Sequence, residues 1–507
     1  MIKKYLHFNL VLILLAFCLA TTNIAQTAPS SLIDNGNSTV LATVGDIEIT
    51  EDEFISGYEY GPSFYKRSAE SKRKYIQYLI NEKLLALKGY DEKIDTTEQV
   101  DEMYKEIIND LATEELFKED ILKPIQATDS ELDSVVTQKQ IEIEMRWLYA
   151  EEFKEIHNYL NLLQNNISFD SLYAKQFSDS VSVDMRSLKT TRYLLGQKNP
   201  VLAKLIDTLR IGTYSSPIYS DEGWYIIKLN NVWNAILTNE TELHKLKYES
   251  RQAIVKNKMD KASDLYVHNL LTAADPTIKR ESFTIVRSFI GQYALSKETF
   301  LEWDLDRKMD SVLAKNTNED IGNKSLVIYS GGELSIDKYL RWYRNRIQYL
   351  KFNKSSLASF SISIEQSIWQ MVRDELLTNL ALQRGMFSKP EVLKQSRWWK
   401  DKIVFSAVMN QIKSSIDLNA EEMNLNDGNN SQSEIDRINQ ETTKRIFREL
   451  QHLKKKYKVE LKEKLLQEVQ VTSENDPKAI DLYTVKKGGL IPRTPFPIID
   501  NFWQYWE

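Results

Sequence analysis

The chain has 507 residues, of which 42% are apolar and 27% are charged, with 66 basic residues, 72 acidic residues and a single cysteine. At about 150 residues per domain, this length predicts about two to four units with sizeable cores. The composition excludes an intrinsically disordered chain and a polytopic membrane protein. The net charge of -6 and the interspersed signs argue against a nucleic-acid partner.

Residues 1–25 have the pattern of a secretory signal peptide. A basic start, MIKK, precedes an apolar run, and small residues follow up to Ala25. We therefore expect cleavage after Ala25 and a periplasmic location. Cys18 leaves a lipoprotein signal open as an alternative, although Phe17 stands where a lipobox normally has a small residue. An uncleaved membrane anchor is a further alternative.

Removal of residues 1–25 takes away the only cysteine, so the mature chain would have no disulfide, thiolate metal site or cysteine nucleophile. The four remaining histidines form no HxxxH or HExxH pair, and neither GxGxxG nor GxxxxGK[ST] occurs in the sequence. We therefore expect no metal, no cofactor and no bound nucleotide.

Residues 38–139 predict a mainly helical N-terminal segment. A short β-like run leads into a capping box in which Thr50 caps the helix and Glu53 reaches back to it. An amphipathic helix is expected to end at Gly89, and a second one covers residues 100–117. Pro124 then predicts a break, and Thr128 to Glu131 predict the cap of a new helix.

Residues 140–233 have a different pattern. Two β-like runs, EIEMRWLYA and EGWYIIKLN, bracket helical stretches at residues 153–164 and 201–209, and this order predicts a compact α/β module inserted in a helical protein. Residues 234–285 predict a long charged helix that returns the chain to the helical part. The expected fold class is therefore α+β, with a mainly helical body and one inserted module.

Residues 286–470 predict a C-terminal helical region with a candidate repeat of the N-terminal segment. The order of an apolar residue, a hydroxyl cap, three mostly polar residues and an aromatic residue occurs at residues 49–54 and again at residues 295–300 and 334–339. Duplication and unrelated helix starts both remain open as explanations.

Two segments of the C-terminal part lack the pattern of packed structure. Residues 421–440 are acidic and Asn-rich, which predicts a linker. The tail, residues 471–507, ends in PFPIIDNFWQYWE, whose aromatic side chains need a covering surface. Packing on the protein's own body and binding to an external partner both remain open.

The middle module resembles the parvulin family of peptidyl-prolyl isomerases. LRIGTYSSPI at residues 209–218 is similar to the family's LxxGxxSxPV signature, and GWYIIKL at residues 223–229 is similar to its closing GYHIIKL strand. Residues 145–149 resemble the first strand, and residues 176–180 resemble the loop before the catalytic acid or thiol.

The flanking segments are similar to SurA-type and PrsA-type extracytoplasmic foldases. The stretches VLATVGDIEITEDEF and LINEKLLALKG carry this resemblance, together with the signal segment and the helical return. In that family, N- and C-terminal segments build a helical chaperone body around a parvulin insert, and the resemblance implies the same arrangement here.

The resemblance places the catalytic network at Trp147, Ser180 and Tyr225, where the family has histidine, Asp or Cys, and histidine. All three residues depart from that pattern, and Leu202 stands at the position of the phenylalanine of the proline pocket. We therefore expect weak or no isomerase activity. The expected substrate-binding residues are Trp147, Leu202, Trp224 and Tyr225, because aromatic side chains give a large contact area.

The implied function is that of an ATP-independent periplasmic chaperone for unfolded or nascent secreted and outer-membrane proteins. Two alternatives stay open: an active prolyl isomerase with a network that lacks histidine, and a fixed subunit of an outer-membrane assembly or secretion complex. A chaperone would suppress the aggregation of unrelated proteins, whereas a subunit would co-purify with one partner.

Overall fold

The computed structural model describes most of the chain between Thr39 and Thr472. The described residues are 39–59, 66, 68, 70–176, 186–220, 223–235, 239–314, 320–347, 350–420 and 431–472. The expected signal segment, Ser180 and the aromatic tail lie outside them. The chain divides into two compact units: the module contains Ile125–Lys258, and the body combines Asp34–Pro124 with Met259–Glu507.

The first part of the body begins with a β-hairpin and continues as helices. Its elements are β1 (Val40–Val44), β2 (Ile47–Thr50), α2 (Glu51–Glu59), α4 (Ser71–Asp91), the 3-10 helix η1 (Ile94–Thr96), α5 (Glu98–Phe117) and the π-helical turn η2 (Lys118–Leu122).

The module follows, and α11 leads from the module into the second part of the body. The module contains α6 (Asp129–Gln140), β3 (Ile141–Ala150), α7 (Phe153–Gln164), α8 (Phe169–Lys175), β4 (Ser187–Thr191), α9 (Arg192–Lys198), α10 (Pro200–Thr208), β5 (Ile218–Ser220) and β6 (Gly223–Asn234), and α11 covers Glu240–Ala274.

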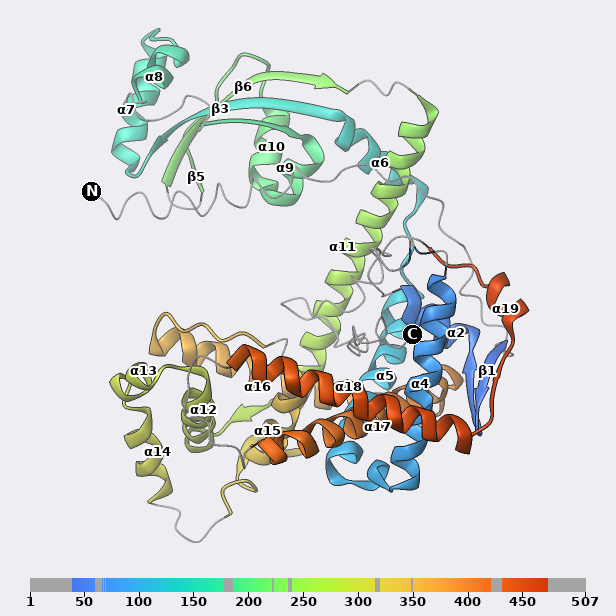
Figure 1. Ribbon diagram of the computed structural model, residues 1–507. Helices are drawn as coiled ribbons and strands as arrows, with labels where there is room; N and C mark the ends of the chain where they lie inside the picture. Colours follow the sequence, from blue (N-terminus) through green and yellow to red (C-terminus); the bar gives the residue numbers. More distant parts are fainter. Residues whose placement is uncertain are drawn as a thin grey trace. The chain divides into compact units, whose positions relative to one another are not determined.

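The second part of the body contains β7 (Thr277–Ile278), α12 (Arg280–Ala294), α13 (Lys297–Glu302), α14 (Leu305–Leu313), β8 (Ser325–Tyr329), β9 (Gly332–Ser335), α15 (Ile336–Arg346), α16 (Leu357–Gln383), the 3-10 helix η4 (Met386–Ser388), α17 (Pro390–Ala420), α18 (Ser431–Lys456), β10 (Val459–Leu461) and α19 (Glu463–Glu468). The fold class is confirmed: a mainly helical chain carries small sheets, with an α/β module between helical segments (Figure 1).

Two three-stranded antiparallel sheets occur in the body, in the orders β10-β1-β2 and β7-β8-β9. In the first sheet, Val44 pairs with Val459 and Ala42 pairs with Leu461. The hairpin near the start of the described chain is therefore completed by a strand near its end. The body can form this sheet only when both ends of the chain are present.

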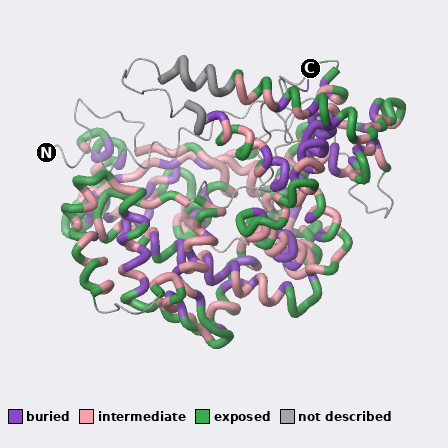
Figure 2. The backbone as a smooth tube through the Cα atoms, turned by 60° about the horizontal axis from the view of Figure 1, so that its bottom comes forward, coloured by how far each residue is buried: buried purple, intermediate pink, exposed green. Residues whose placement is uncertain are grey.

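Three hydrophobic clusters of described residues lie in the body. The first gathers residues of β1, β2, α2 and α4 with residues of α17, α18 and α19 around Phe54. The second gathers residues of α12, β8, β9, α15 and α16 around Tyr339, and the third gathers residues of α5 and α17 around Val404. Figure 2 shows buried and exposed positions alternating along the helices, as expected for amphipathic helices with one face on a core. None of the described helices is long and apolar enough to span a bilayer.

A buried lysine lies inside the first cluster. The Nζ atom of Lys83 is 2.6 Å from Oε1 of Glu53 and 2.7 Å from Oδ2 of Asp401, and its side chain is 0% exposed. Tyr90 donates a hydrogen bond of 2.6 Å to the other carboxylate oxygen of Asp401. Burial alone would lower the pKa of Lys83, but the two carboxylates outweigh it and raise the pKa above its ordinary value. Lys83 therefore stays charged.

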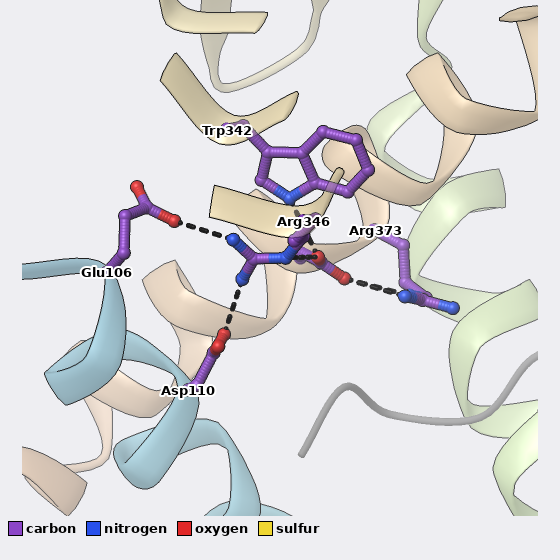
Figure 3. Close-up of polar contacts among 6 residues, drawn as sticks. Glu106, Asp110, Trp342, Arg346 and Arg373 are labelled. Atoms are coloured by element: carbon purple, nitrogen blue, oxygen red, sulfur yellow. Dashed lines mark hydrogen bonds and ion pairs between the residues drawn. The ribbon is translucent and has the colours of Figure 1, made fainter. Parts of the chain in front are cut away.

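A second buried charge cluster surrounds Arg346 (Figure 3). Its guanidinium donates hydrogen bonds of 3.0 Å to Glu106 and 2.6 Å to Asp110, and its Nε atom lies 3.4 Å from Oδ2 of Asp374. Arg373 forms an ion pair of 2.8 Å with Asp374. Burial raises the pKa of Asp110 to about 7, and the carboxylates of Asp374 and Glu106 add to the rise, although Arg346 opposes it.

The local sequence predicted several boundaries correctly. The helix expected at residues 153–164 is α7, and Thr128 and Glu131 form a complete capping box at the start of α6. The capping box at Thr50 is only half formed: its hydroxyl accepts the Glu53 N–H at 3.3 Å, but the Glu53 carboxylate turns inward to Lys83.

Two other expectations were wrong. Gly89 does not end its helix, because α4 continues to Asp91; a Cβ atom on Gly89 would lie 2.3 Å from Val404 of α17. The glycine is needed for close helix packing and not for a turn. The predicted linker is also too long, because α18 begins at Ser431 and residues 431–440 are helical.

Replacing Lys83 with methionine should destabilise the body strongly, because Glu53 and Asp401 would remain buried without a cation. Breaking a buried ion pair in this way costs about 3–5 kcal/mol. Urea unfolding followed by circular dichroism measures the loss. The matched control is Lys105→Met, which removes an exposed pair with Asp101 and should cost less than about 0.5 kcal/mol. Equal losses in the two variants would contradict a structural role for Lys83.

The raised pKa of Asp110 predicts a pH-dependent stability. A carboxyl group whose pKa is higher in the folded protein than its unfolded value of about 3.9 stabilises the fold below that value, and the contribution is lost as pH rises towards 7. Asp110→Asn should remove this dependence. Urea unfolding of both proteins between pH 4 and pH 8 should show the wild-type stability falling relative to the variant by up to about 1.4 kcal/mol per pH unit. Parallel curves would refute the assignment.

Candidate functional site

The module is built on a four-stranded antiparallel sheet in the order β4-β3-β6-β5. The central strands β3 and β6 pair along their length, from Ile141 with Asn234 to Ala150 with Trp224. Because side chains alternate across a strand, one face of the sheet packs with α9 and α10, and the other packs with α7 and α8 (Figure 1).

The loop that carries the signature resemblance is fixed against β6. The N–H of Gly212, at φ +85°, donates to the carbonyl of Leu229 at 2.7 Å. Further along, the N–H of Ser215 donates to the carbonyl of Ile227 at 2.8 Å, and the buried Ser215 hydroxyl accepts the Ile227 N–H at 3.0 Å. The glycine and serine of the signature therefore hold the loop beside the sheet edge.

Gly223 starts β6 at a place with no room for a side chain. A Cβ atom there would lie 2.5 Å from the ring of Tyr149 and 2.8 Å from the carbonyl oxygen of Ala150. The glycine at the start of this family-like strand thus has a steric cause here. It lets β6 pair closely with the end of β3.

The structure brings three of the predicted site residues to one face of the sheet. Trp147 of β3, Leu202 of α10 and Tyr225 of β6 are partly buried and pack against the cluster that includes Met145. Trp224 does not join them, because it lies on the opposite face and packs with the α7 and α8 side. Ser180 lies outside the described residues.

Tyr149 belongs to the same face and was missed in the sequence. Its ring centroid is 5.3 Å from that of Tyr225, and the guanidinium of Arg186 lies 5.5 Å from the Tyr149 ring. The signal was present, since Tyr149 is two residues beyond Trp147 and so shares its face of the strand. Trp147, Tyr149, Leu202 and Tyr225 are called the aromatic face below.

The backbone of Tyr149 is held by a side chain. Pairing of β3 with β4 ends at Arg146 and Ser187, so β4 does not reach Tyr149. The amide of Gln176 accepts the Tyr149 N–H at 3.1 Å and donates to the Tyr149 carbonyl at 3.0 Å. It takes the place of a strand partner and keeps the end of β3 in line.

A second group of aromatic side chains, also missed in the sequence, lies around Trp224 on the other face. The ring centroids of Phe153 and Tyr219 are 4.6 Å and 5.3 Å from that of Trp224, and these two side chains are 52% and 63% exposed. His157, the single histidine in the sequence between residues 140 and 233, is exposed on α7 and stacks on Phe153 at 5.6 Å.

The aromatic face offers rings, an aliphatic side chain and phenolic hydroxyls. Among the described residues, no group of three or more His, Cys, Asp or Glu side chains is arranged to hold a metal ion. The chemistry that this face supports directly is contact with apolar and aromatic segments, with hydrogen bonding at its rim.

Gly223→Ala should destabilise the module, because the new methyl group overlaps the Tyr149 ring and a carbonyl oxygen. Forced overlaps of this kind cost about 1–3 kcal/mol. The control is Gly196→Ala in α9, where a Cβ atom would meet only the tip of Arg192 at 3.3 Å and the helix should gain slightly. Hydrogen exchange of β3 and β6 measures the change. Unchanged protection in Gly223→Ala would show that a glycine is not sterically required at this position.

A comparison with known protein families finds a match within the module. Residues 149–231 match the family described as "Rotamase: PPIC-type PPIASE domain". The chain is similar to the crystal structure of foldase protein PrsA from Streptococcus pneumoniae, with 14% identity, a TM-score of 0.22 and coverage of 45% of this chain and 91% of that chain.

It is also similar to peptidylprolyl isomerase (PrsA) from Bacillus cereus, with 17% identity, a TM-score of 0.23 and coverage of 46% and 92%. No curated protein matches the chain. The family match over residues 149–231 shows that the chain contains a PPIC-type rotamase domain with the parvulin fold, set between helical segments.

Proposed function

We propose that the protein is an ATP-independent chaperone that binds unfolded polypeptides, and that its parvulin module works mainly as a binding module. The observation that carries the proposal is the aromatic face. Trp147 and Tyr225, which stand where the parvulin resemblance expects histidines, gather on one face of the sheet with Leu202, where the resemblance expects the phenylalanine of the proline pocket.

Aromatic side chains suit this role because they bind with a large area and lose little conformational freedom. The rings of Trp147, Tyr149 and Tyr225 are partly buried, so they are fixed before a client arrives. A pre-organised apolar face of this kind would bind many unfolded segments weakly, and it requires no nucleotide.

Prolyl isomerisation makes a different demand. The twisted amide lies at the top of a barrier of about 20 kcal/mol, and an isomerase must bind it better than either planar state. The family uses two facing histidines for this purpose, whereas His157 lies on the α7 side, stacked on Phe153. We propose that isomerase activity is weak or absent.

The PPIC-type match over residues 149–231 favours active isomerisation as the second candidate. Tyr225 and Ser180 would then supply hydroxyl groups in place of the imidazoles.

The expected signal segment supports a location outside the cytoplasm, with secreted or outer-membrane polypeptides as clients. A fixed place in an outer-membrane assembly or secretion complex is the third proposal, with the aromatic tail as its docking segment.

Client binding can be measured with a permanently unfolded polypeptide, such as reduced carboxymethylated α-lactalbumin, in a fluorescence anisotropy titration. We expect saturable binding without ATP. Trp147→Ala and Tyr225→Ala should each weaken it about five- to tenfold, because truncating an aromatic contact residue costs more than about 1 kcal/mol.

The matched control is Tyr219→Ala, which removes an exposed aromatic side chain from the other face and should leave the affinity unchanged. Circular dichroism of each variant shows whether the fold is kept. Equal losses in the variants of both faces, or no binding by the wild-type chain, would contradict the proposed site.

A further inference from the structure

The body contains the same order of elements twice. A hairpin, a helix, a long helix, a 3-10 turn and another long helix occur as β1, β2, α2, α4, η1 and α5, and again as β8, β9, α15, α16, η4 and α17. We propose that the body is a duplicated unit whose two copies exchange their last strands, and that the parvulin module is inserted in the first copy only. This inference does not depend on the proposed function.

The first helix starts in the same way in both copies. The Thr50 hydroxyl accepts the Glu53 N–H at 3.3 Å, and the Ser335 hydroxyl accepts the Lys338 N–H at 3.2 Å. Four residues after each cap stands a fully buried ring, Phe54 or Tyr339. Each ring stacks on a tyrosine one turn later, at centroid distances of 5.5 Å and 6.2 Å.

The long helices match at a constant spacing of 292 residues. Lys93 and Gly385, which precede η1 and η4, share this spacing and both have the left-handed conformation, at φ 59° and 70°. The buried residues correspond as well: Ile76 with Ile368, Leu85 with Leu377, and Val100 with Val392. Gly89 is not the equivalent of Gly385, although both glycines follow an apolar helical stretch. Gly89 lies inside α4, four residues before Lys93.

The packing of the copies is reciprocal. Helix α4 of the first copy packs against α17 of the second, and α16 of the second packs against α5 of the first. After its return helix α11, the first copy ends in β7, which pairs with β8 of the second copy. After α18, the second copy ends in β10, which pairs with β1 of the first. Neither copy completes its sheet alone.

One buried ion pair of the body has its equivalent in the cluster around Arg346. The Nζ atom of Lys402 on α17 lies 2.7 Å from the carboxylate of Glu82 on α4, next to Lys83. The residues 292 positions away from this pair are Asp110 on α5 and Asp374 on α16. These are two acids, and Arg346 contacts both of them. The second cluster thus replaces a direct acid–lysine pair with two acids joined by an arginine (Figure 3).

The copies differ in what links their second long helix to the helix that follows it, α11 in the first copy and α18 in the second. In the first copy, the module elements from α6 to β6 lie between α5 and α11, whereas only residues 421–430 lie between α17 and α18 of the second. Helices α12 to α14 connect the copies and have no counterpart among the described residues of the first copy. The module is therefore inserted at one of two equivalent positions along the chain.

Transferring the charge arrangement of one copy to the other tests the equivalence. Arg346→Met leaves the acids around it without their shared cation, and Asp110→Lys places a second cation beside Arg346. Each change should lower the body's melting temperature in the full chain by about 5 °C or more. In the double variant, the new lysine can pair with Asp374 as Lys402 pairs with Glu82. We expect it to regain at least half of the summed loss.

An additive loss in the double variant, measured by differential scanning calorimetry, would overturn the equivalence. If a single variant does not fold, native-state hydrogen exchange of the unmodified chain provides the second measurement. Because the copies exchange strands, α4 and α16 should open in one event at one rate. Opening of α16 while α4 stays protected would show two independent halves and would also overturn the proposal.

Discussion

Antiparallel pairing of β1 with β10 is the constraint on which the architecture of the body depends. It places Val459–Leu461 beside Val40–Val44, so the body is closed by residues more than 400 positions apart. Contacts of such high sequence separation form late and slowly, since the entropy of loop closure must be overcome first. The strands of the module all lie between Ile141 and Asn234, so its sheet does not depend on pairing across the length of the chain.

Within the module, the residues that fix the backbone differ from the residues that form the aromatic face. Gly223 and Ser215 fix the geometry of β6 and its flanking loop through a close backbone approach and paired hydrogen bonds. Trp147 and Tyr225, which stand where the parvulin resemblance expects histidines, pack on one face of the sheet. Side chains on the face of such a sheet can be replaced while residues such as Gly223 and Ser215 keep the backbone in place. One fold can therefore support different chemistry.

Local sequence patterns predicted the module's strands, the helix of residues 153–164 and the capping box at Thr128, because each depends on neighbours a few positions apart. The failures have long-range causes. Gly89 appeared to be a helix stop, but its absent side chain makes room for Val404. Glu53 was expected to complete a cap, but Lys83 draws it into the core. Strand alternation places Tyr149 on the face of Trp147, but its contact with Tyr225 depends on the register between two strands.

The proposed role of the module as a binding module is tested most directly by measuring whether the protein catalyses proline isomerisation. Exchange NMR gives the cis-to-trans rates of a series of X-Pro peptides with the chain from Gln26 onward, without a coupling protease. We expect rates equal or close to the uncatalysed ones at stoichiometric protein. Clear acceleration that disappears in Ser180→Ala or Tyr225→Phe would contradict the proposed role, and would identify an isomerase that works with hydroxyl groups in place of imidazoles.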